Sequence, residues 1–209
     1  MFGEADETIP SVPGDYGGWH RGRSDYAVWL IRLDGDGIQQ TIEAARLHMA
    51  DYLLPTYGRQ GHITLFVCGF LAKRRDHDDD FTEEQFRDQA RLLRHAGIMP
   101  FRIEVGAMQS FASAPFLEVS DPEGGIARVR DVLTRHCQEI ARDAYIPHVT
   151  IGLYSGAFPR GIVEKRMASF HAAPRSVEVG HVTFATYGAS RVGGPLTYRH
   201  EVELRGPLS

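Results

Sequence analysis

The stretch GHITLFVCGF, residues 61–70, suggests both a fold and a chemistry, because it starts an apolar, β-branched strand with a His-x-Thr triplet. In a strand, residues i and i+2 face the same side, so the imidazole of His62 and the hydroxyl of Thr64 are expected to be neighbours. An imidazole titrates near neutrality, and a threonine hydroxyl donates a hydrogen bond to an anionic oxygen. The triplet therefore provides half of an acid–base site.

A second copy of this half-site occurs in PHVTIGLY, residues 147–154, where His148 and Thr150 repeat the pair 86 residues later. Hydrolysis of a phosphodiester needs a base that activates water and an acid that protonates the leaving oxygen. Two half-sites that face each other across a cleft supply both, and the two hydroxyls remain to hold phosphate oxygens. The pair of triplets predicts such a site without a metal or another cofactor.

The order of predicted elements indicates an internal duplication. Each half reads strand, helix, strand, helix, strand, and the short sequences IEVG (103–106) and VEVG (177–180) fall on the third strand of each half. The predicted strands are residues 26–33, 62–71, 101–111, 115–120, 147–154, 176–187 and 197–205. The predicted helices are residues 38–54, 82–95, 126–144 and 161–170.

A third triplet, His181-Val-Thr183, lies in VEVGHVTFATY. If VEVG matches IEVG, its histidine and threonine fall where the first half has Ala107 and Gln109, which form no such pair. We therefore expect His181 and Thr183 to be bystanders, with an edge contact to substrate as the alternative.

Composition describes an ordinary soluble globular protein; it argues against the clamping of long nucleic acid and leaves open a small anionic ligand in a local pocket. The formal net charge is −4, so no global basic field is present to clamp a duplex. The sequence has no apolar run that spans a bilayer and no signal-like start, which predicts a cytoplasmic protein without a membrane partner. Residues 1–24 are rich in Gly, Pro and charge and predict a flexible or surface-bound lead-in to one domain, residues 25–209. We expect a monomer.

The paired triplets and the tail TYGASRVGGPLTYRHEVEL resemble the two-histidine (2H) phosphoesterase superfamily, which includes RNA ligase-like and 2′,3′-cyclic phosphodiesterase proteins. The resemblance covers roughly residues 25–205. It implies a bilobal α+β fold, with two antiparallel sheets flanking a central cleft and helices on the outer faces. We place the two lobes at residues 26–111 and 115–205. The resemblance also implies metal-independent catalysis by His62, His148, Thr64 and Thr150 on a 2′,3′-cyclic phosphate or a 2′-5′ linkage.

Substrate contacts are predicted from the alternation of side chains along the motif strands. Phe66 and Tyr154 fall on the same faces as the histidines, so either ring is a candidate to stack on a nucleobase, with core packing as the alternative. PHVTIGLYSG carries no Lys or Arg, unlike many RNA ligase-like proteins, which favours a small nucleotide or short RNA over long RNA.

Other readings are open or disfavoured. Within the enzyme hypothesis, the alternative activity is degradation of a cyclic oligonucleotide signal. The alternative from another class is a non-catalytic nucleotide-binding module. The loop RDHDDD, residues 75–80, gathers possible metal ligands, but its place ahead of a capped helix predicts a solvated loop. Cys68 and Cys137 are expected to be buried free thiols.

Overall fold

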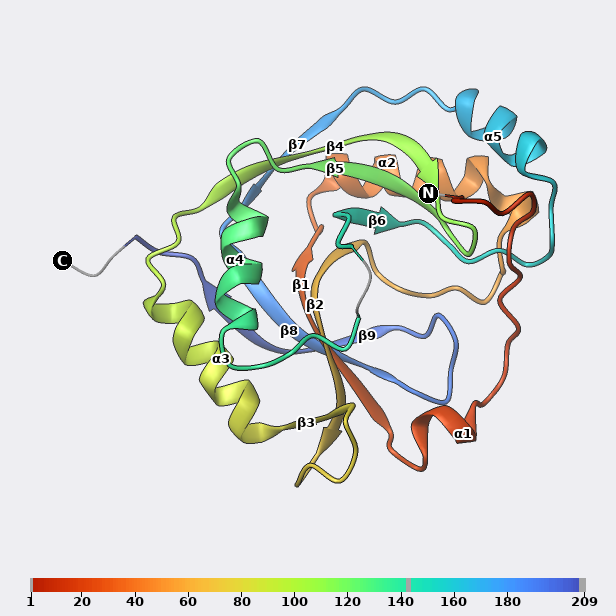
Figure 1. Cartoon of the computed structure of the whole chain (residues 1–209). Coiled ribbons are helices and arrows are strands. Elements are labelled where there is room, and N and C mark those ends of the chain that lie inside the picture. Colours follow the sequence, from red (N-terminus) through yellow and green to blue (C-terminus); the bar gives the residue numbers. More distant parts are fainter. Residues whose placement is uncertain (1, 142–143, 207–209) are drawn as a thin grey trace.

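Two β-sheets share one hydrophobic core in the structure, a computed structural model that describes residues 2–141 and 144–206 (Figure 1). In chain order the strands are β1 (Asp25–Arg32), β2 (His62–Ala72), β3 (Asp80–Thr82), β4 (Phe101–Ser110), β5 (Pro115–Ser120), β6 (His148–Thr150), β7 (Arg175–Val179), β8 (His181–Gly188) and β9 (Leu196–Glu203). The helices are α1 (Gly17–His20), α2 (Asp36–His48), α3 (Glu83–His95), α4 (Gly125–Thr134) and α5 (Arg160–Ala168), with a 3-10 turn at Ala50–Tyr52. The predicted α+β class is confirmed.

The two sheets have strand orders β3-β2-β1-β8-β9 and β6-β5-β4-β7. All pairs are antiparallel except β2 with the short edge strand β3. The three adjacent strands β2-β1-β8 of the first sheet correspond to β6-β5-β4 of the second. Each half of the chain therefore contributes the strand predicted as its third, β4 or β8, to the sheet of the other half. The predicted boundary between residues 26–111 and 115–205 is therefore not a boundary between sheets.

This exchange of strands corrects the match between IEVG and VEVG. Those segments lie on β4 and β7, which pair with each other in one sheet, with Ile103 opposite Val177. The equivalent of β4 in the second half is β8, which holds the corresponding place beside β1. The segment 176–187, predicted as one strand, is two strands in different sheets, because the chain crosses between sheets at Gly180.

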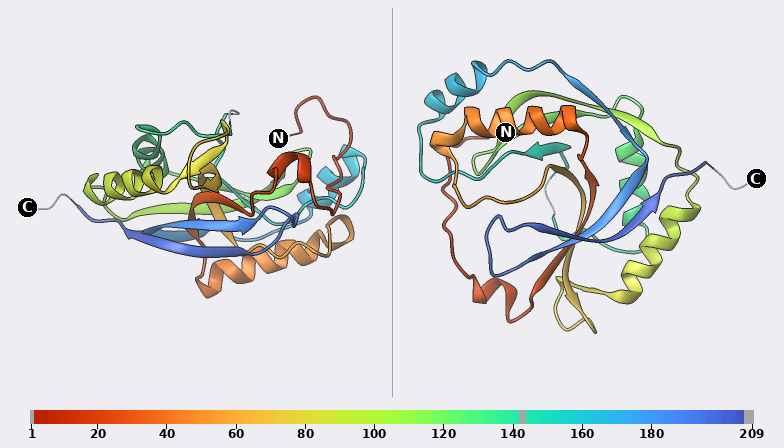
Figure 2. Two further views of the ribbon diagram at one scale, coloured as in Figure 1. Left: turned by 90° about the horizontal axis from the view of Figure 1, so that it is seen from below. Right: turned by 180° about the vertical axis from the view of Figure 1, so that it is seen from behind.

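The helices pack in two pairs around the sheets (Figures 1 and 2). Helices α3 and α4 lie side by side, with α3 in contact with β9 and α4 with β2, whereas α5 contacts β4 and α2 contacts β7. The predicted capping box at the start of α3 is present, since the side chains and backbone amides of Thr82 and Gln85 bond reciprocally. This packing leaves the two motif strands, β2 and β6, close to each other.

The N-terminal residues lie along the surface of the domain rather than projecting freely. Backbone amides of Thr8 and Ser11 donate to the carbonyls of Phe158 and Tyr154. Farther along, the Arg23 guanidinium donates to Asp79 and Asp80 at 2.6 Å each. Asp79 and Asp80 of the RDHDDD loop thus hold the end of the lead-in against the domain, in the surface-bound arrangement.

No helix within the described ranges is long and apolar enough to cross a membrane.

Candidate active site

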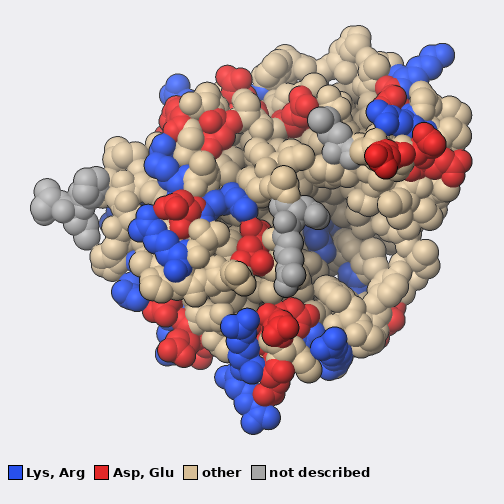
Figure 3. All heavy atoms as spheres, viewed as in Figure 1, with Lys and Arg blue, Asp and Glu red and all other residues tan. Residues whose placement is uncertain are grey.

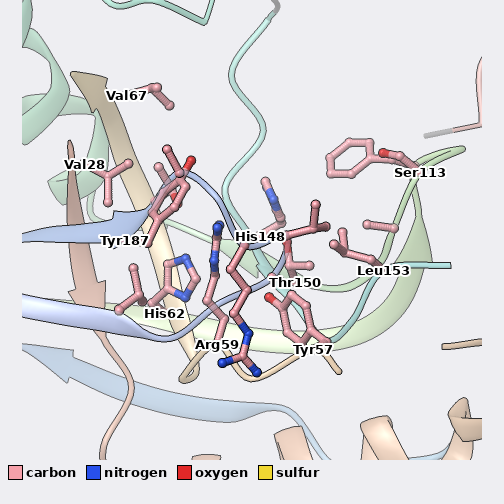
Figure 4. A pocket seen from close by; sticks show the side chains of 18 of the residues that line it. Val28, Tyr57, Arg59, His62, Val67, Ser113, His148, Thr150, Leu153 and Tyr187 are labelled. Atoms are coloured by element: carbon pink, nitrogen blue, oxygen red, sulfur yellow. The ribbon is translucent and has the colours of Figure 1, made fainter. Parts of the chain in front are cut away.

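The two predicted half-sites meet in one cleft of about 470 Å³, lined by His62, Thr64, His148 and Thr150 (Figure 4). His62 and Thr64 come from β2, and His148 and Thr150 come from β6. His62 is only 7% exposed, while the other three side chains are half-buried. The volume is within the range of about 300–1,000 Å³ that is common for small-molecule sites.

Both imidazoles are anchored in the same way. Nδ1 of His62 lies 2.7 Å from the carbonyl oxygen of Gln60, and Nδ1 of His148 lies 2.7 Å from that of Ile146. A carbonyl only accepts, so Nδ1 carries the proton in each neutral ring and Nε2 is left with its lone pair. Each Nε2 is then the atom available for proton transfer.

The surroundings lower the pKa of both histidines by different amounts. Burial is the main cause for His62 and lowers its pKa to about 4, and the nearby charges of Arg59 and His148 act in the same direction. Burial also lowers the pKa of His148 from its usual value. The site therefore separates two chemically identical groups by environment, as a paired acid and base require.

The rings are held by different neighbours. His148 makes edge-to-face contacts with Phe111 and Phe116, at centroid distances of 5.0 and 5.4 Å. On the other side, the side chain of Gln60 bonds both ways with the backbone of Leu196, at 2.8 and 3.0 Å. That exchange fixes the carbonyl to which His62 donates.

Side chains replace a neighbouring strand along the open edge of β2. The Tyr145 hydroxyl donates to the carbonyl of Thr64 at 2.9 Å, Arg130 donates to the carbonyl of Leu65, and the Glu139 carboxylate accepts the amide of Val67 at 3.0 Å. Arg130 also pairs with Glu139 at 2.8 Å and lies over the Tyr145 ring. The loop before β6 is thereby fastened to the strand that carries the other half-site.

The predicted helix 126–144 is too long, because α4 ends at Thr134 and the chain continues as this loop. Residues 139 and 140 bond to the backbone of Val67 instead of continuing the helix. These tertiary contacts outweigh the helical period of the local sequence.

Phe66, predicted to contact substrate, is fully buried in the core and absent from the cleft lining. Register shifts from Trp29 opposite Phe66 to Leu30 opposite Thr64, so Leu65 is an extra residue in a β-bulge. A bulge reverses the alternation of side chains beyond it. Phe66 therefore turns into the core, and Val67 takes the place on the cleft wall.

Tyr154 is also fully buried, which corrects its assignment as a substrate contact. Strand β6 ends at Thr150, so the alternation that placed Tyr154 beside His148 does not continue. Its hydroxyl shares a buried hydrogen bond of 2.6 Å with Ser110, and Leu153 lines the cleft instead.

The third triplet lies outside the cleft lining. His181 is exposed opposite Glu203 on β9, and Thr183 is buried between β1 and β9 opposite Leu30 and Glu201. Its position agrees with the role of bystander, although the alignment that led to this expectation was wrong.

The positive charge of the cleft comes from residues that the sequence reading missed. Arg59 and Arg191 line it, and none of the described lining residues is Asp or Glu. Figure 3 shows the hollow with basic side chains inside it. The Arg59 guanidinium lies 3.8 Å from the ring centroid of Tyr187, a cation–π contact, and donates to the carbonyl of Gly194.

A repeated pattern in the sequence marks these missed residues. TYGR (56–59) and TYGASR (186–191) each place a Tyr-Gly pair just before an arginine, and Tyr57, Arg59, Tyr187 and Arg191 all line the cleft. Neither segment belongs to a predicted catalytic motif, so only the tertiary structure brings them to the histidines.

Comparisons with known proteins agree with this architecture. A sequence model of the 2′-5′ RNA ligase superfamily matches residues 35–191. The crystal structure of E. coli LigT complexed with 3′-AMP is similar at 16% identity and a TM-score of 0.59, covering 87% of this chain and 98% of that one. The protein TT0787 of Thermus thermophilus is similar at 17% identity and a TM-score of 0.56, with coverage of 87% and 98%. A search of curated proteins found no match.

Proposed function

The chain belongs to the 2′-5′ RNA ligase superfamily, and we propose that it is a metal-independent phosphodiesterase acting on a 2′,3′-cyclic phosphate or a 2′-5′-linked nucleotide. The family supports a phosphodiesterase-type function. The observation that carries the proposal is the pair of His-x-Thr half-sites in one cleft, each imidazole with Nε2 available.

The environments of the two histidines suggest their roles. His62 has the more strongly lowered pKa and stays neutral, so its Nε2 accepts the proton of the attacking water. His148 is less buried and takes up a proton more readily, all the more when an anionic phosphate is bound beside it. His148 is then the acid that protonates the leaving oxygen.

The hydrolysis balances with these two groups. The water oxygen forms a bond to phosphorus as His62 takes a proton, one phosphoester bond breaks, and the departing ribose oxygen receives the proton of His148. A cyclic phosphate opens to a monophosphate, and a 2′-5′ linkage separates into two parts. Thr64 and Thr150 donate hydrogen bonds to the non-bridging oxygens, and Arg59 offsets their negative charge.

The substrate is proposed to be a small nucleotide or short RNA. Crystal structures of E. coli LigT complexed with 3′-AMP, ATP and NADP+ support nucleotides as the ligand class. A cleft of about 470 Å³ suits one or two nucleotides better than a duplex.

The test is turnover of 2′,3′-cyclic mononucleotides, 2′-5′-linked oligoadenylates and cyclic oligonucleotides with EDTA present. We expect His62→Ala and His148→Ala each to lower kcat by about 10² to 10⁴. His181→Ala is the matched control and should retain activity. Complete loss of wild-type activity in EDTA would overturn the metal-free mechanism, and binding without any turnover would point to a nucleotide-binding module.

A further inference from the structure

Two exposed aromatic residues of the N-terminal segment line the cleft. Tyr16 and Trp19 are 46% and 42% exposed, yet both belong to the same cleft lining as the histidines. They precede residues 35–191, the part of the chain that the family model matches. Large apolar rings left open to water at a cleft are typical of binding surfaces.

The two residues are already ordered. The Trp19 ring packs against Tyr26 and Phe70, with centroids 5.1 and 4.8 Å apart. The Tyr16 hydroxyl donates to the carbonyl of Val12 at 2.6 Å. A ligand that binds here loses little affinity to the ordering of side chains.

Arg23 secures the short helix α1 that carries Trp19. Its guanidinium donates to the carbonyls of Trp19 and His20, at 3.2 and 2.9 Å, in addition to the aspartates of the RDHDDD loop. The aromatic corner is therefore attached to the sheet and not only to its own segment.

A series of ring contacts, which passes through the buried Tyr26, links this corner to an arginine of the cleft wall. Tyr26 contacts Trp19 on one side and Tyr187, 5.4 Å away, on the other, and Tyr187 in turn stacks with Arg59. One end of the cleft thus presents imidazoles and guanidinium groups, and the other presents aromatic rings. A ligand that matches both ends is anionic at one end and flat and aromatic at the other.

We propose that Tyr16 and Trp19 form a nucleobase-binding subsite, which stacks on the base of the nucleotide whose phosphate lies between His62 and His148. This rests on the proposed function for the phosphate end. Every nucleobase has a flat face, so the subsite selects nucleotides over cyclic phosphates without a base and tolerates different bases.

Binding of 3′-AMP and of inorganic phosphate, measured by calorimetry, tests the subsite without requiring turnover. Trp19→Ala should weaken 3′-AMP binding about tenfold to a hundredfold and leave phosphate binding unchanged. Trp19→Phe keeps a ring and should retain most of the affinity. Tyr16→Ala should weaken 3′-AMP in the same selective way, with Tyr16→Phe as its control.

Tryptophan fluorescence gives a second readout. Trp29 is fully buried, so quenching by 3′-AMP in the wild type should come from Trp19 and disappear in Trp19→Phe. Unchanged 3′-AMP affinity in both alanine variants would overturn the subsite and leave the phosphodiesterase proposal intact. Equal loss of phosphate and 3′-AMP binding would assign these residues a structural role and also overturn it. Failure of the proposed function is separate, since it shows as turnover that survives in His62→Ala and His148→Ala.

Discussion

The hydroxyl of Tyr145 donates a hydrogen bond of 2.9 Å to the backbone carbonyl of Thr64, so the loop that leads into one half-site is fastened to the strand of the other. Arg46 makes a second connection, since it donates to the carbonyls of Arg59 and Ile151, which flank the two motifs. The spacing between the histidines is thus set by bonds between the half-sites.

Removing the Tyr145 hydroxyl should loosen that spacing. Tyr145→Phe is expected to cost about 0.5–1.5 kcal/mol of stability and to lower kcat severalfold with little change in KM, because the loop and β2 can shift relative to each other. Urea unfolding and steady-state kinetics measure the two effects. Tyr154→Phe, which breaks a hydrogen bond to Ser110 between two residues that are not part of the cleft lining, is the matched control and should lose stability but not kcat. The same kcat in both variants would argue against a positioning role for Tyr145.

The free energy of unfolding should decrease as the pH is lowered, because His62 is buried in its neutral form. Its pKa is about 4 in the folded protein and near 6.5 when unfolded, so the unfolded chain binds more protons between these values. The stabilisation is complete above pH 6.5 and is lost as pH falls through 6.5 toward 4, on the order of 3 kcal/mol. Urea unfolding of wild type and His62→Gln from pH 4 to 8 measures the difference. Parallel curves for the two proteins would contradict this account.

The pH dependence of kcat/KM should reflect the lowered pKa values of both histidines. This ratio reports the free enzyme, in which one imidazole must be protonated and the other neutral. Because both pKa values lie below 6.5, we expect kcat/KM to be highest on the acidic side of pH 6.5 and to decline above it. A plateau that extends through pH 8 would show that the histidines are not the titrating pair.

Arg59 should influence both substrate affinity and the base. Arg59→Gln removes a charge that lowers the pKa of His62, so the acidic limb of kcat/KM should move to higher pH while KM rises. Arg199→Gln, which removes an exposed arginine paired with Asp25 outside the cleft lining, is the control and should change neither. A rise in KM without movement of the acidic limb would restrict Arg59 to substrate binding.

Much of the fold and the centre of the site follow from local patterns. The two His-x-Thr triplets, the alternation of strands and helices, and the capping box of Thr82 and Gln85 are properties of neighbouring residues, so the sequence alone predicts them. The errors arose where a local rule was extended too far. The bulge at Leu65 turned Phe66 away from the cleft, the end of β6 did the same for Tyr154, and Gly180 divided one predicted strand between two sheets.

The sequence by itself determined the class of the fold and the chemistry available, because side-chain types and short-range periodicity are written in consecutive residues. The tertiary structure alone decided which side chains share the cleft. It exchanged β4 and β8 between the sheets, brought Arg59, Tyr187 and Trp19 to the paired histidines, and gave His62 and His148 different degrees of burial. These outcomes depend on contacts between residues far apart in the chain, and burial, which separates the two pKa values, exists only once those contacts have formed.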